Sequence, residues 1–331
     1  MNDPTIELPN VGAYVRGSPE ASRQLVRWRD LLTAYADLEL ETDHEAYLSH
    51  FVYGSEMTAH YKANGRSVAG FAGPTWAKWI VFDFDRADLT DALADARKLT
   101  AALLQRYPML DGFVPVYFSG SKGFHVYLEL AHEPPPAVGF NAVCRTLAEA
   151  LAAVAGVKID TAIYDANRIL RLPNSKHPKT GLFKRRIDPE ALFWLDVACI
   201  VDMAKEPTGD GIPSQSDRCA ALENDWQEAE RRTRRKAEAR AVIRRDAAEG
   251  DARAPRFLLD FLRFGVDEGE RRPTLFRCAA WMAEQGAADR LIHALLEEPA
   301  RDMGITPADV KRQIDCGIAH ARRQSEGGPP A

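Results

Sequence analysis

Three short motifs follow one another between residues 79 and 181, and each places polar side chains beside an apolar strand pattern. Residues 79–85 read Trp-Ile-Val-Phe-Asp-Phe-Asp, and residues 119–128 read Ser-Gly-Ser-Lys-Gly-Phe-His-Val-Tyr-Leu. The third motif starts with Ile-Asp at 159–160 and continues as Asn-Arg-Ile-Leu-Arg-Leu-Pro-Asn-Ser-Lys-His-Pro-Lys-Thr-Gly at 167–181. Along the chain, strand patterns of this kind are interleaved with helical patterns, which predicts an α/β or α+β domain.

Helical and strand periodicities can be assigned around these motifs. We expect helices at about 18–37, 91–106 and 140–155, and strands at 78–85, 114–118, 125–130 and 157–159, with shorter strands or edges at 183–186 and 192–195. Strands 114–118 and 125–130 flank a short glycine-containing turn, which is typical of antiparallel pairing. The predicted core is therefore a mixed or antiparallel sheet.

The character of the chain changes after residue 205. Residues 207–216 are rich in Pro, Gly, Ser and Asp and predict a linker, and residues 224–250 predict a highly charged helix with a solvated face. The pattern beyond residue 255 is entirely helical. We predict an α/β domain at 1–205, a charged linker and helix at 206–254, and a small all-α domain at 255–325.

Composition narrows the class of protein only a little. The 331 residues are 46% hydrophobic and 27% charged, which allows a sizeable core, and the net charge of −5 still permits local basic surfaces for nucleic acid. The five cysteines are scattered without a Cys-x-x-Cys pair, so we expect no zinc. The N-terminus does not read as a signal peptide, and no apolar stretch approaches the ~20 residues of a membrane span. We expect a cytoplasmic protein with no membrane association.

The first motif indicates a metal site. Asp83 and Asp85 are two apart in a strand, so both lie on one face, where two carboxylates repel unless a cation lies between them. Oxygen ligands of this kind suit Mg²⁺ or Mn²⁺. On this motif alone, a strand end with solvated aspartates is an equally good interpretation. Metal-dependent glycosyltransferases also use Asp-x-Asp after a strand.

The second motif supplies donors for phosphate. The turn offers backbone N–H groups, the hydroxyls of Ser119 and Ser121 and the ammonium of Lys122, while His125 begins the next strand and can donate a hydrogen bond or carry charge. By itself such a turn is more often a plain hairpin with a satisfied core histidine. A glycosyltransferase has no need of this turn and histidine, so the motif favours the other interpretation.

The third motif adds a carboxylate and a basic segment. Asp160 can be the third metal ligand, and Asp165 competes for that role or caps a turn. A dense set of donors follows: Arg171, Ser175, His177, Lys179 and Lys184. Unpaired buried charge is costly, so a polyanionic ligand is the simpler explanation for these donors. Three carboxylates can hold two divalent ions that stabilise an attacking 3′-oxygen and a leaving pyrophosphate, as nucleotidyl transfer requires.

In order, spacing and flanking strands, the motifs resemble those of the archaeo-eukaryotic primase superfamily, over roughly residues 45–196. The resemblance implies that domain 1–205 is a primase-type catalytic domain and that the metal ligands are Asp83, Asp85 and Asp160. It implies that the nucleotide contacts are Ser119, Lys122, His125, Arg171, Ser175 and His177. The chain departs from many relatives in lacking a cysteine cluster for zinc, and it has Ser121 where eukaryotic relatives place a second basic residue.

The segments 268–276 and 310–314 are similar to the helical domain often appended to such primases, and its candidate nucleic-acid contacts here are Arg271, Arg272, Lys311 and Arg312. The resemblance implies a DNA primase or primase-polymerase that uses two Mg²⁺ or Mn²⁺ ions, a single-stranded DNA template and NTPs or dNTPs. No Gly-x-x-x-x-Gly-Lys-Ser/Thr occurs, so a replicative helicase would act in trans. The alternatives are an end-joining or gap-filling repair polymerase and a non-catalytic replication DNA-binding protein.

Overall fold

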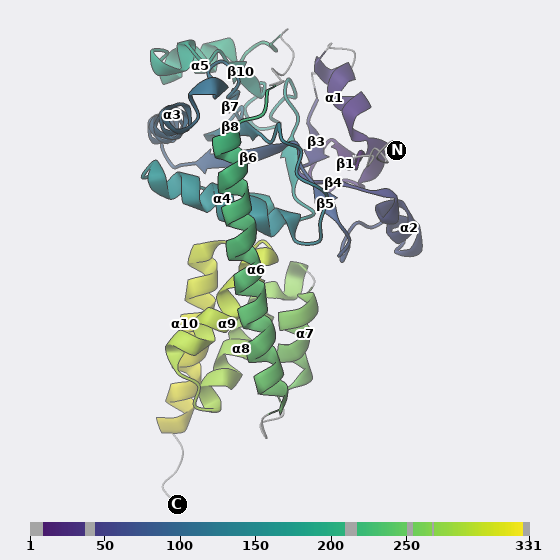
Figure 1. The fold of residues 1–331 in the computed structure, drawn as a ribbon, viewed down its shortest axis with the longest axis vertical. Coiled ribbons are helices and arrows are strands. Elements are labelled where there is room, and N and C mark those ends of the chain that lie inside the picture. Colours follow the sequence, from purple (N-terminus) through teal and green to yellow (C-terminus); the bar gives the residue numbers. More distant parts are fainter. Residues whose placement is uncertain (1–8, 37–43, 209–216, 250–253, 267, 327–331) are drawn as a thin grey trace, which may run out of the picture. The chain divides into compact units, whose positions relative to one another are not determined.

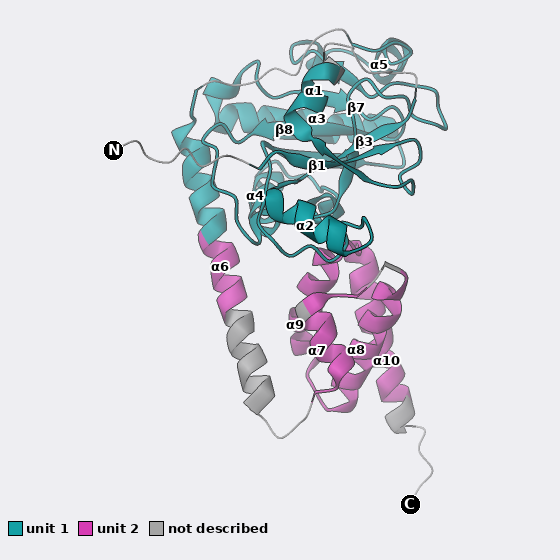
Figure 2. Ribbon diagram, turned by 90° about the vertical axis from the view of Figure 1, so that its right-hand side faces the viewer, with its two compact units in different colours: residues 1–230 teal, residues 231–331 magenta. Residues whose placement is uncertain are grey.

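The computed structural model describes residues 9–36, 44–208, 217–249, 254–266 and 268–326 (Figure 1). The chain divides into two compact units, residues 1–230 and 231–331 (Figure 2). The first is mixed α/β with antiparallel sheets and the second is helical, which confirms the predicted fold class. The predicted boundaries at 205 and 254 stay predictions; helix α6 (Ala220–Glu249) crosses residue 230. The predicted linker lies outside the described residues from 209 onward.

The first sheet has six short strands, all paired antiparallel. Its order is β5–β4–β1–β3–β9, and β2 also pairs with β1. The strands are β1 (Val11–Arg16), β2 (Gln24–Arg27), β3 (Ala46–Ser49), β4 (Val52–Tyr53), β5 (Thr75–Trp76) and β9 (Ile169–Arg171). The predicted helix at 18–37 is wrong at its start, because Leu25 of β2 pairs with Ala13 of β1 and only α1 (Trp28–Ala36) is helical. Asp37 lies outside the described residues.

The second sheet carries the first two motifs. Its antiparallel order is β10–β7–β8–β6, with strands β6 (Trp79–Asp85), β7 (Val116–Phe118), β8 (Gly123–Glu129) and β10 (Arg185–Ile187). Strand alternation places Ile80, Phe82 and Phe84 on one face, where they are fully buried. The other face therefore carries Trp79 and both aspartates of the motif. The strands predicted at 78–85, 114–118, 125–130 and 183–186 are confirmed to within a few residues.

Two long helices, α3 (Leu89–Arg106) and α4 (Phe140–Val154), pack against this sheet (Figure 1). The Asp88 carboxylate caps α3, and buried side chains at helical spacing, among them Leu93, Ala96 and Leu99, explain why its sequence predicts a helix. Residues 157–159 do not form the predicted strand, since they make no ladder with a neighbour. Residues 192–195 are not a strand either, because a 3₁₀ turn occupies Ala191–Phe193.

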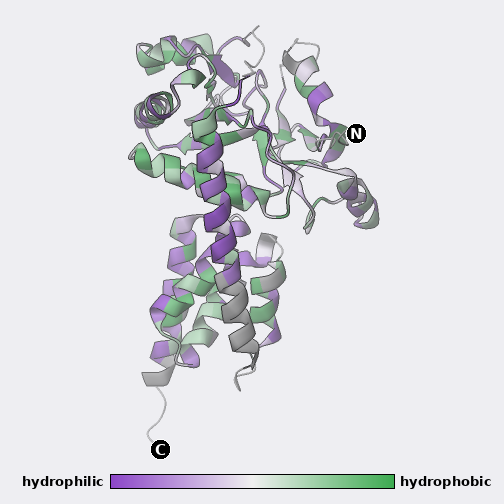
Figure 3. Ribbon diagram, viewed as in Figure 1, coloured by the Kyte–Doolittle hydropathy of each residue, from purple (hydrophilic) through white to green (hydrophobic). Residues whose placement is uncertain are grey.

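Shorter elements complete the first unit. They are helices α2 (Ser55–Ala63) and α5 (Val197–Met203) and 3₁₀ turns η1 (Pro108–Leu110) and η2 (Thr161–Tyr164). The beginning of α6 buries Leu222 and Trp226 in the core of this unit, and its Asp225 forms an ion pair with Arg106. Further along, α6 is strongly hydrophilic (Figure 3), in agreement with the predicted solvated helix.

The second unit is built from α7 (Arg256–Phe264), α8 (Arg271–Glu284), α9 (Asp289–Asp302) and α10 (Pro307–Glu326). A separate apolar core joins these helices through residues such as Phe261, Leu275, Ile292 and Ile314. Of its basic candidates, Arg272 and Arg312 pair with Asp309, and Lys311 pairs with Asp315. Across the described residues, none of the helices has both the length and the apolar character needed to cross a bilayer.

Candidate active site

The first two motifs face each other across one strand pair. In the antiparallel register of β6 and β8, Asp83 lies opposite His125 and Asp85 lies opposite Gly123. The Nε2 atom of His125 is 3.5 Å from Oδ1 of Asp83. Both side chains lie on the sheet face away from α3 and α4, because alternation gives that other face to the buried phenylalanines. The pair thus belongs to a polar sheet face, which also carries Tyr127 and Glu129 of β8.

A tight turn connects β7 to β8 beside this centre. The N–H of Ser119 donates to the carbonyl of Gly123 (2.9 Å), and the N–H of Gly123 donates to the Ser119 hydroxyl (3.2 Å). Gly120 adopts φ +85°, and a Cβ at this position would lie 2.9 Å from the carbonyl oxygen of Leu182. Lys122 is exposed on the same turn. The two glycines are therefore required by the backbone geometry, independently of any ligand.

Asp160 is attached directly to the first motif. Its N–H donates to the carbonyl of Asp83 (3.0 Å), and its carboxylate accepts from the N–H of Ala162 (2.9 Å), capping η2. Asp165, the competing candidate, caps the next turn through the N–H of Asn167 (2.8 Å). Asp160, and not Asp165, is among the charges that raise the pKa of Asp83. The structure thus brings together Asp83, Asp85 and Asp160.

Arg86 connects the two chain segments that carry these carboxylates. Its guanidinium donates to the carbonyl oxygens of Asp85 (3.0 Å) and Lys158 and to the carboxylate of Asp95 in α3 (2.7 Å). One side chain therefore links the end of β6 to the segment that leads into Asp160. The sequence motif gives no signal for this role, because Arg86 lies just beyond the aspartates and its partners are distant in the chain.

Burial and mutual repulsion shift the pKa values in this cluster. Burial, followed by the charges of Asp85 and Asp160, raises the pKa of Asp83 to about 7. Burial also raises the pKa of Asp85, while Lys122 opposes that shift. Burial and nearby cations, first Lys184, hold the pKa of His125 well below its ordinary value. His125 is therefore a neutral hydrogen-bonding group at neutral pH, and the carboxylates form a site that a cation would stabilise.

The donor set suits a hard divalent cation, since it consists of carboxylate oxygens, and the charges of Asp85 and Asp160 raise the pKa of Asp83. In the conformation described here, however, no three His, Cys, Asp or Glu side chains among the described residues are placed to hold a metal ion. One carboxylate oxygen of Asp160 caps η2.

The basic segment of the third motif is more internally satisfied than the sequence suggested. Arg171, on β9, donates to the hydroxyl of Tyr47 (2.9 Å) and to the carboxylate of Glu45 (3.4 Å). The Ser175 hydroxyl is fully buried and donates to the carbonyl of Leu172 (2.7 Å). His177 is half-buried, and its Nδ1 accepts from the N–H of Lys179 (3.2 Å).

Lys184 is the most unusual of these donors. Its ammonium is fully buried and donates to the hydroxyl of Tyr127 (2.7 Å) and the carbonyl of Arg171 (2.8 Å). Burial lowers its pKa to about 7. The sequence argument that this segment holds unpaired donors is therefore wrong for Ser175 and Lys184. The accessible cations near the carboxylates are instead Lys122 and Arg168, both of which lower the pKa of Asp85.

His50 is a buried histidine close enough to His125 to lower its pKa, and sequence reasoning missed it. It follows β3, its N–H donates to the carbonyl of Arg168 (2.7 Å), and its ring lies between Phe51 and Tyr164. Neither ring nitrogen has a hydrogen-bond partner among the described residues. Burial lowers its pKa to about 3, so the ring is neutral. A short strand far from the three motifs gives no sequence signal that its histidine lies near them.

Comparisons with known proteins add little beyond the geometry. No protein-family model matches the chain, and no curated protein matches it. Among solved structures, the chain is similar to the crystal structure of primase RepB′, with a TM-score of 0.37 and 13% sequence identity. That alignment covers 97% of this chain and 95% of the other.

Proposed function

We propose that this protein is a template-dependent nucleotidyl transferase that synthesises primers on single-stranded DNA: a primase or primase-polymerase. The observation that carries the proposal is the convergence of Asp83, Asp85 and Asp160 from two separate segments, beside His125. The charges of Asp85 and Asp160 act on the largely buried carboxylate of Asp83, and this repulsion costs stability. Charged groups that are held together although they destabilise the fold are typical of a functional site.

The three aspartates would hold Mg²⁺ or Mn²⁺, and these ions supply charge neutralisation at the attacking and leaving oxygens. Lys122 and Arg168 are the accessible cations beside the carboxylates, and they would bind the oxygens of the incoming triphosphate. His125 is neutral, so it would donate a hydrogen bond to a phosphate oxygen and would contribute no positive charge. No protein nucleophile is required, because positioning and electrostatics lower the barrier.

The remaining residues of the third motif would support this site from behind. Arg171 orders β3 through Tyr47 and Glu45, and Ser175 fixes the turn after β9. Lys184 joins Arg171 at the end of β9 to Tyr127 on β8, so it links the two sheets. We propose that the partners are a single-stranded DNA template, NTPs or dNTPs and a helicase acting in trans, in the cytoplasm.

Primer synthesis on unprimed single-stranded DNA tests this function. With Mg²⁺ or Mn²⁺ and labelled NTPs or dNTPs, the wild type is expected to form new products, and an Asp83→Asn/Asp85→Asn variant is expected to form none. Asp111→Asn is the matched control, because it removes one carboxylate from an exposed position outside the site.

Other outcomes would overturn the proposal in different ways. Extension of a supplied primer without new starts would identify a gap-filling or end-joining polymerase. DNA binding without either reaction would identify a non-catalytic replication protein. Products that persist in the double variant would show that the carboxylates are not the catalytic groups.

A further inference from the structure

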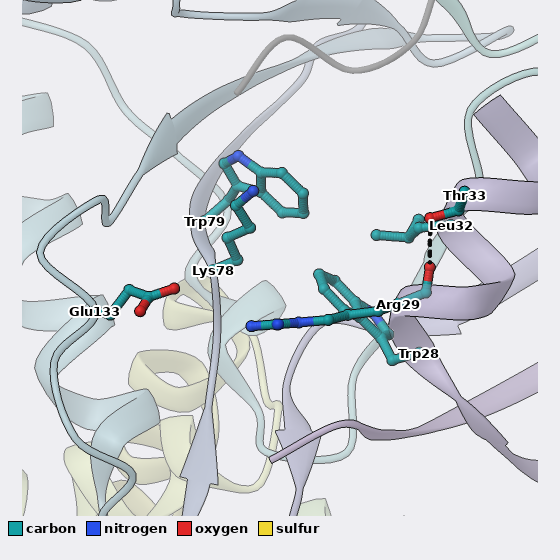
Figure 4. A pocket seen from close by; sticks show the side chains of 7 residues that line it. All are labelled: Trp28, Arg29, Leu32, Thr33, Lys78, Trp79 and Glu133. Carbon is teal, nitrogen blue, oxygen red and sulfur yellow. Dashed lines mark hydrogen bonds between the residues drawn. The ribbon is translucent and has the colours of Figure 1, made fainter. Parts of the chain in front are cut away.

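A pocket lies beside the second sheet, at the opposite end of β6 from Asp85. It has a volume of about 370 Å³ and lies between the first turns of α1 and the start of β6 (Figure 4). Its lining residues are Trp28, Arg29, Leu32, Thr33, Lys78, Trp79 and Glu133. Two indole rings and two cationic side chains dominate this lining. None of these residues belongs to the site described above.

The pocket and the carboxylates share one face of the sheet. Trp79 and Asp83 are four residues apart on β6, so strand alternation points both side chains the same way, about 13 Å apart. A strand of nucleic acid gripped over about four nucleotides or more covers such a distance. One extended ligand can therefore occupy both the pocket and the candidate active site.

Aromatic rings bridge this distance. The ring centroids of Trp28 and Trp79 are 5.6 Å apart, those of Trp79 and Tyr127 are 6.5 Å apart, and those of Tyr127 and His125 are 6.5 Å apart. The series begins in the pocket and ends beside Asp83. Trp28 and His125 are buried, whereas Trp79 and Tyr127 between them are partly exposed. Partly exposed rings are the feature on which unpaired bases stack, because every base presents a π-face.

The charges of the pocket distinguish among nucleic-acid ligands. The Arg29 guanidinium extends across the pocket toward Lys78 and Glu133 (Figure 4), and within the described residues it makes no ion pair. Lys78 lies over the Trp79 ring, 4.9 Å from its centroid, and forms an ion pair with Glu129 (3.2 Å). Two cations beside two carboxylates leave the pocket nearly neutral. That balance suits a phosphodiester with a single charge better than a free triphosphate, which carries several.

We propose that this pocket binds one nucleoside of the single-stranded template, with its base against Trp79 and its phosphodiester between Arg29 and Lys78. The identity of the strand as template rests on the proposed function, whereas the binding of a single strand does not. Lys78 leaves the Trp79 ring for the phosphate when the base arrives. The pocket then fixes the strand a few nucleotides from the position where the incoming nucleotide reacts.

Base stacking can be measured without turnover. A series of oligothymidylates carries 2-aminopurine at one position, which differs stepwise from one oligonucleotide to the next. Each is titrated with the wild-type protein in the presence of EDTA. The fluorescence of the base is expected to be quenched at one position and to recover with Trp79→Leu, which should weaken binding roughly 5- to 150-fold, as expected for one lost stacking contact. Arg29→Glu should weaken binding about tenfold. It should disturb no other contact, since this side chain is exposed.

Lys62→Glu is the matched control for Arg29→Glu, because it makes the same change of charge on exposed α2, away from the pocket lining. Its binding should equal that of the wild type. Uniform quenching at all positions, quenching that survives Trp79→Leu, or equal weakening by Lys62→Glu would overturn the proposal. Quenching of free 2-aminopurine riboside triphosphate, but not of the strand, would overturn it in favour of a nucleotide pocket.

The same measurements separate this inference from the proposed function. The Asp83→Asn/Asp85→Asn variant should retain position-specific quenching, because its substitutions lie outside the pocket. If the wild type shows the quenching but makes no primers, the function fails and the pocket stands. If primers are made equally well by the wild type and Arg29→Glu and no quenching is seen, the pocket fails and the function stands.

Discussion

Asp83→Asn is expected to abolish nucleotidyl transfer and, at the same time, to stabilise the metal-free protein. Activity should fall at least on the order of 10³-fold, since a lost metal ligand removes several kcal/mol of transition-state stabilisation. The fold should gain on the order of 1–4 kcal/mol near neutral pH, because the variant removes a buried charge that Asp85 and Asp160 repel. A gain in stability that accompanies a loss of function identifies a functional site.

The pH dependence of that gain follows from the pKa of Asp83. This value is 3.8 in an unfolded chain and about 7 in the fold, so the folded protein holds the proton more tightly. The stability contributed by the protonated group is therefore complete below about pH 4 and is lost as the pH rises through 7. Asparagine cannot ionise, so the difference in unfolding free energy between variant and wild type should open between pH 4 and 7.

Urea unfolding in EDTA across pH 4 to 8 measures this difference, with Asp111→Asn as a control whose carboxylate is exposed. Equal stability of Asp83→Asn and wild type at pH 8 would contradict the repulsion that we assign to the carboxylates. Retained activity in Asp83→Asn would contradict its assigned role as a metal ligand.

Gly123→Ala is expected to damage both the fold and the activity. A Cβ at Gly123 would collide with the carbonyl oxygen of Phe84 and lie 2.8 Å from a carboxylate oxygen of Asp85. Backbone atoms cannot rotate away, so the ends of β6 and β8 must separate. We expect a loss of about 1–3 kcal/mol of stability from overpacking. Displacement of Asp85 should reduce activity on the order of 10²-fold.

The control for this variant is Gly269→Ala, because a Cβ at Gly269 meets no atom within 4 Å and the position has no positive φ. Thermal unfolding and primer synthesis should both be unchanged there. Wild-type activity in Gly123→Ala would show that the close approach of β6 and β8 is not needed to position Asp85.

Long, locally periodic elements could be predicted from the sequence. The predictions for β6, β8, α3 and α4 hold because each combines a clear hydrophobic period with a turn or cap at its end. The first sheet could not be predicted. Strands such as β3 and β4 are short and buried throughout, so no alternation is visible, and β3 pairs with β9 far along the chain.

The candidate site was partly predictable for the same reason. Asp83, Asp85 and His125 lie in one strand pair whose pattern is local, and their proximity follows from the register. The contacts of Arg171 with Glu45 and Tyr47, and the burial of Lys184 between the two sheets, depend on a sheet that the sequence did not reveal. Donors that looked unpaired in the sequence therefore have hydrogen-bond partners within the fold.

The pocket at Trp28 and Trp79 illustrates the other limit. Trp79 is visible in the sequence as the first residue of the first motif, but Trp28 belongs to a helix whose start was mispredicted. Only the packing of α1 beside β6 places the two indoles 5.6 Å apart. The contact between two side chains on different elements leaves no periodic pattern in the sequence, so sequence analysis alone cannot predict it.

Binding of Mn²⁺ tests the central claim most directly. Electron paramagnetic resonance can count the ions bound when Mn²⁺ is titrated into the protein with a non-hydrolysable nucleoside triphosphate. The wild type and Asp111→Asn should each bind two ions, and Asp83→Asn/Asp85→Asn should lose both. No tight binding in the wild type, or the same number of bound ions in the double variant, would contradict a metal-dependent nucleotide site at these three aspartates.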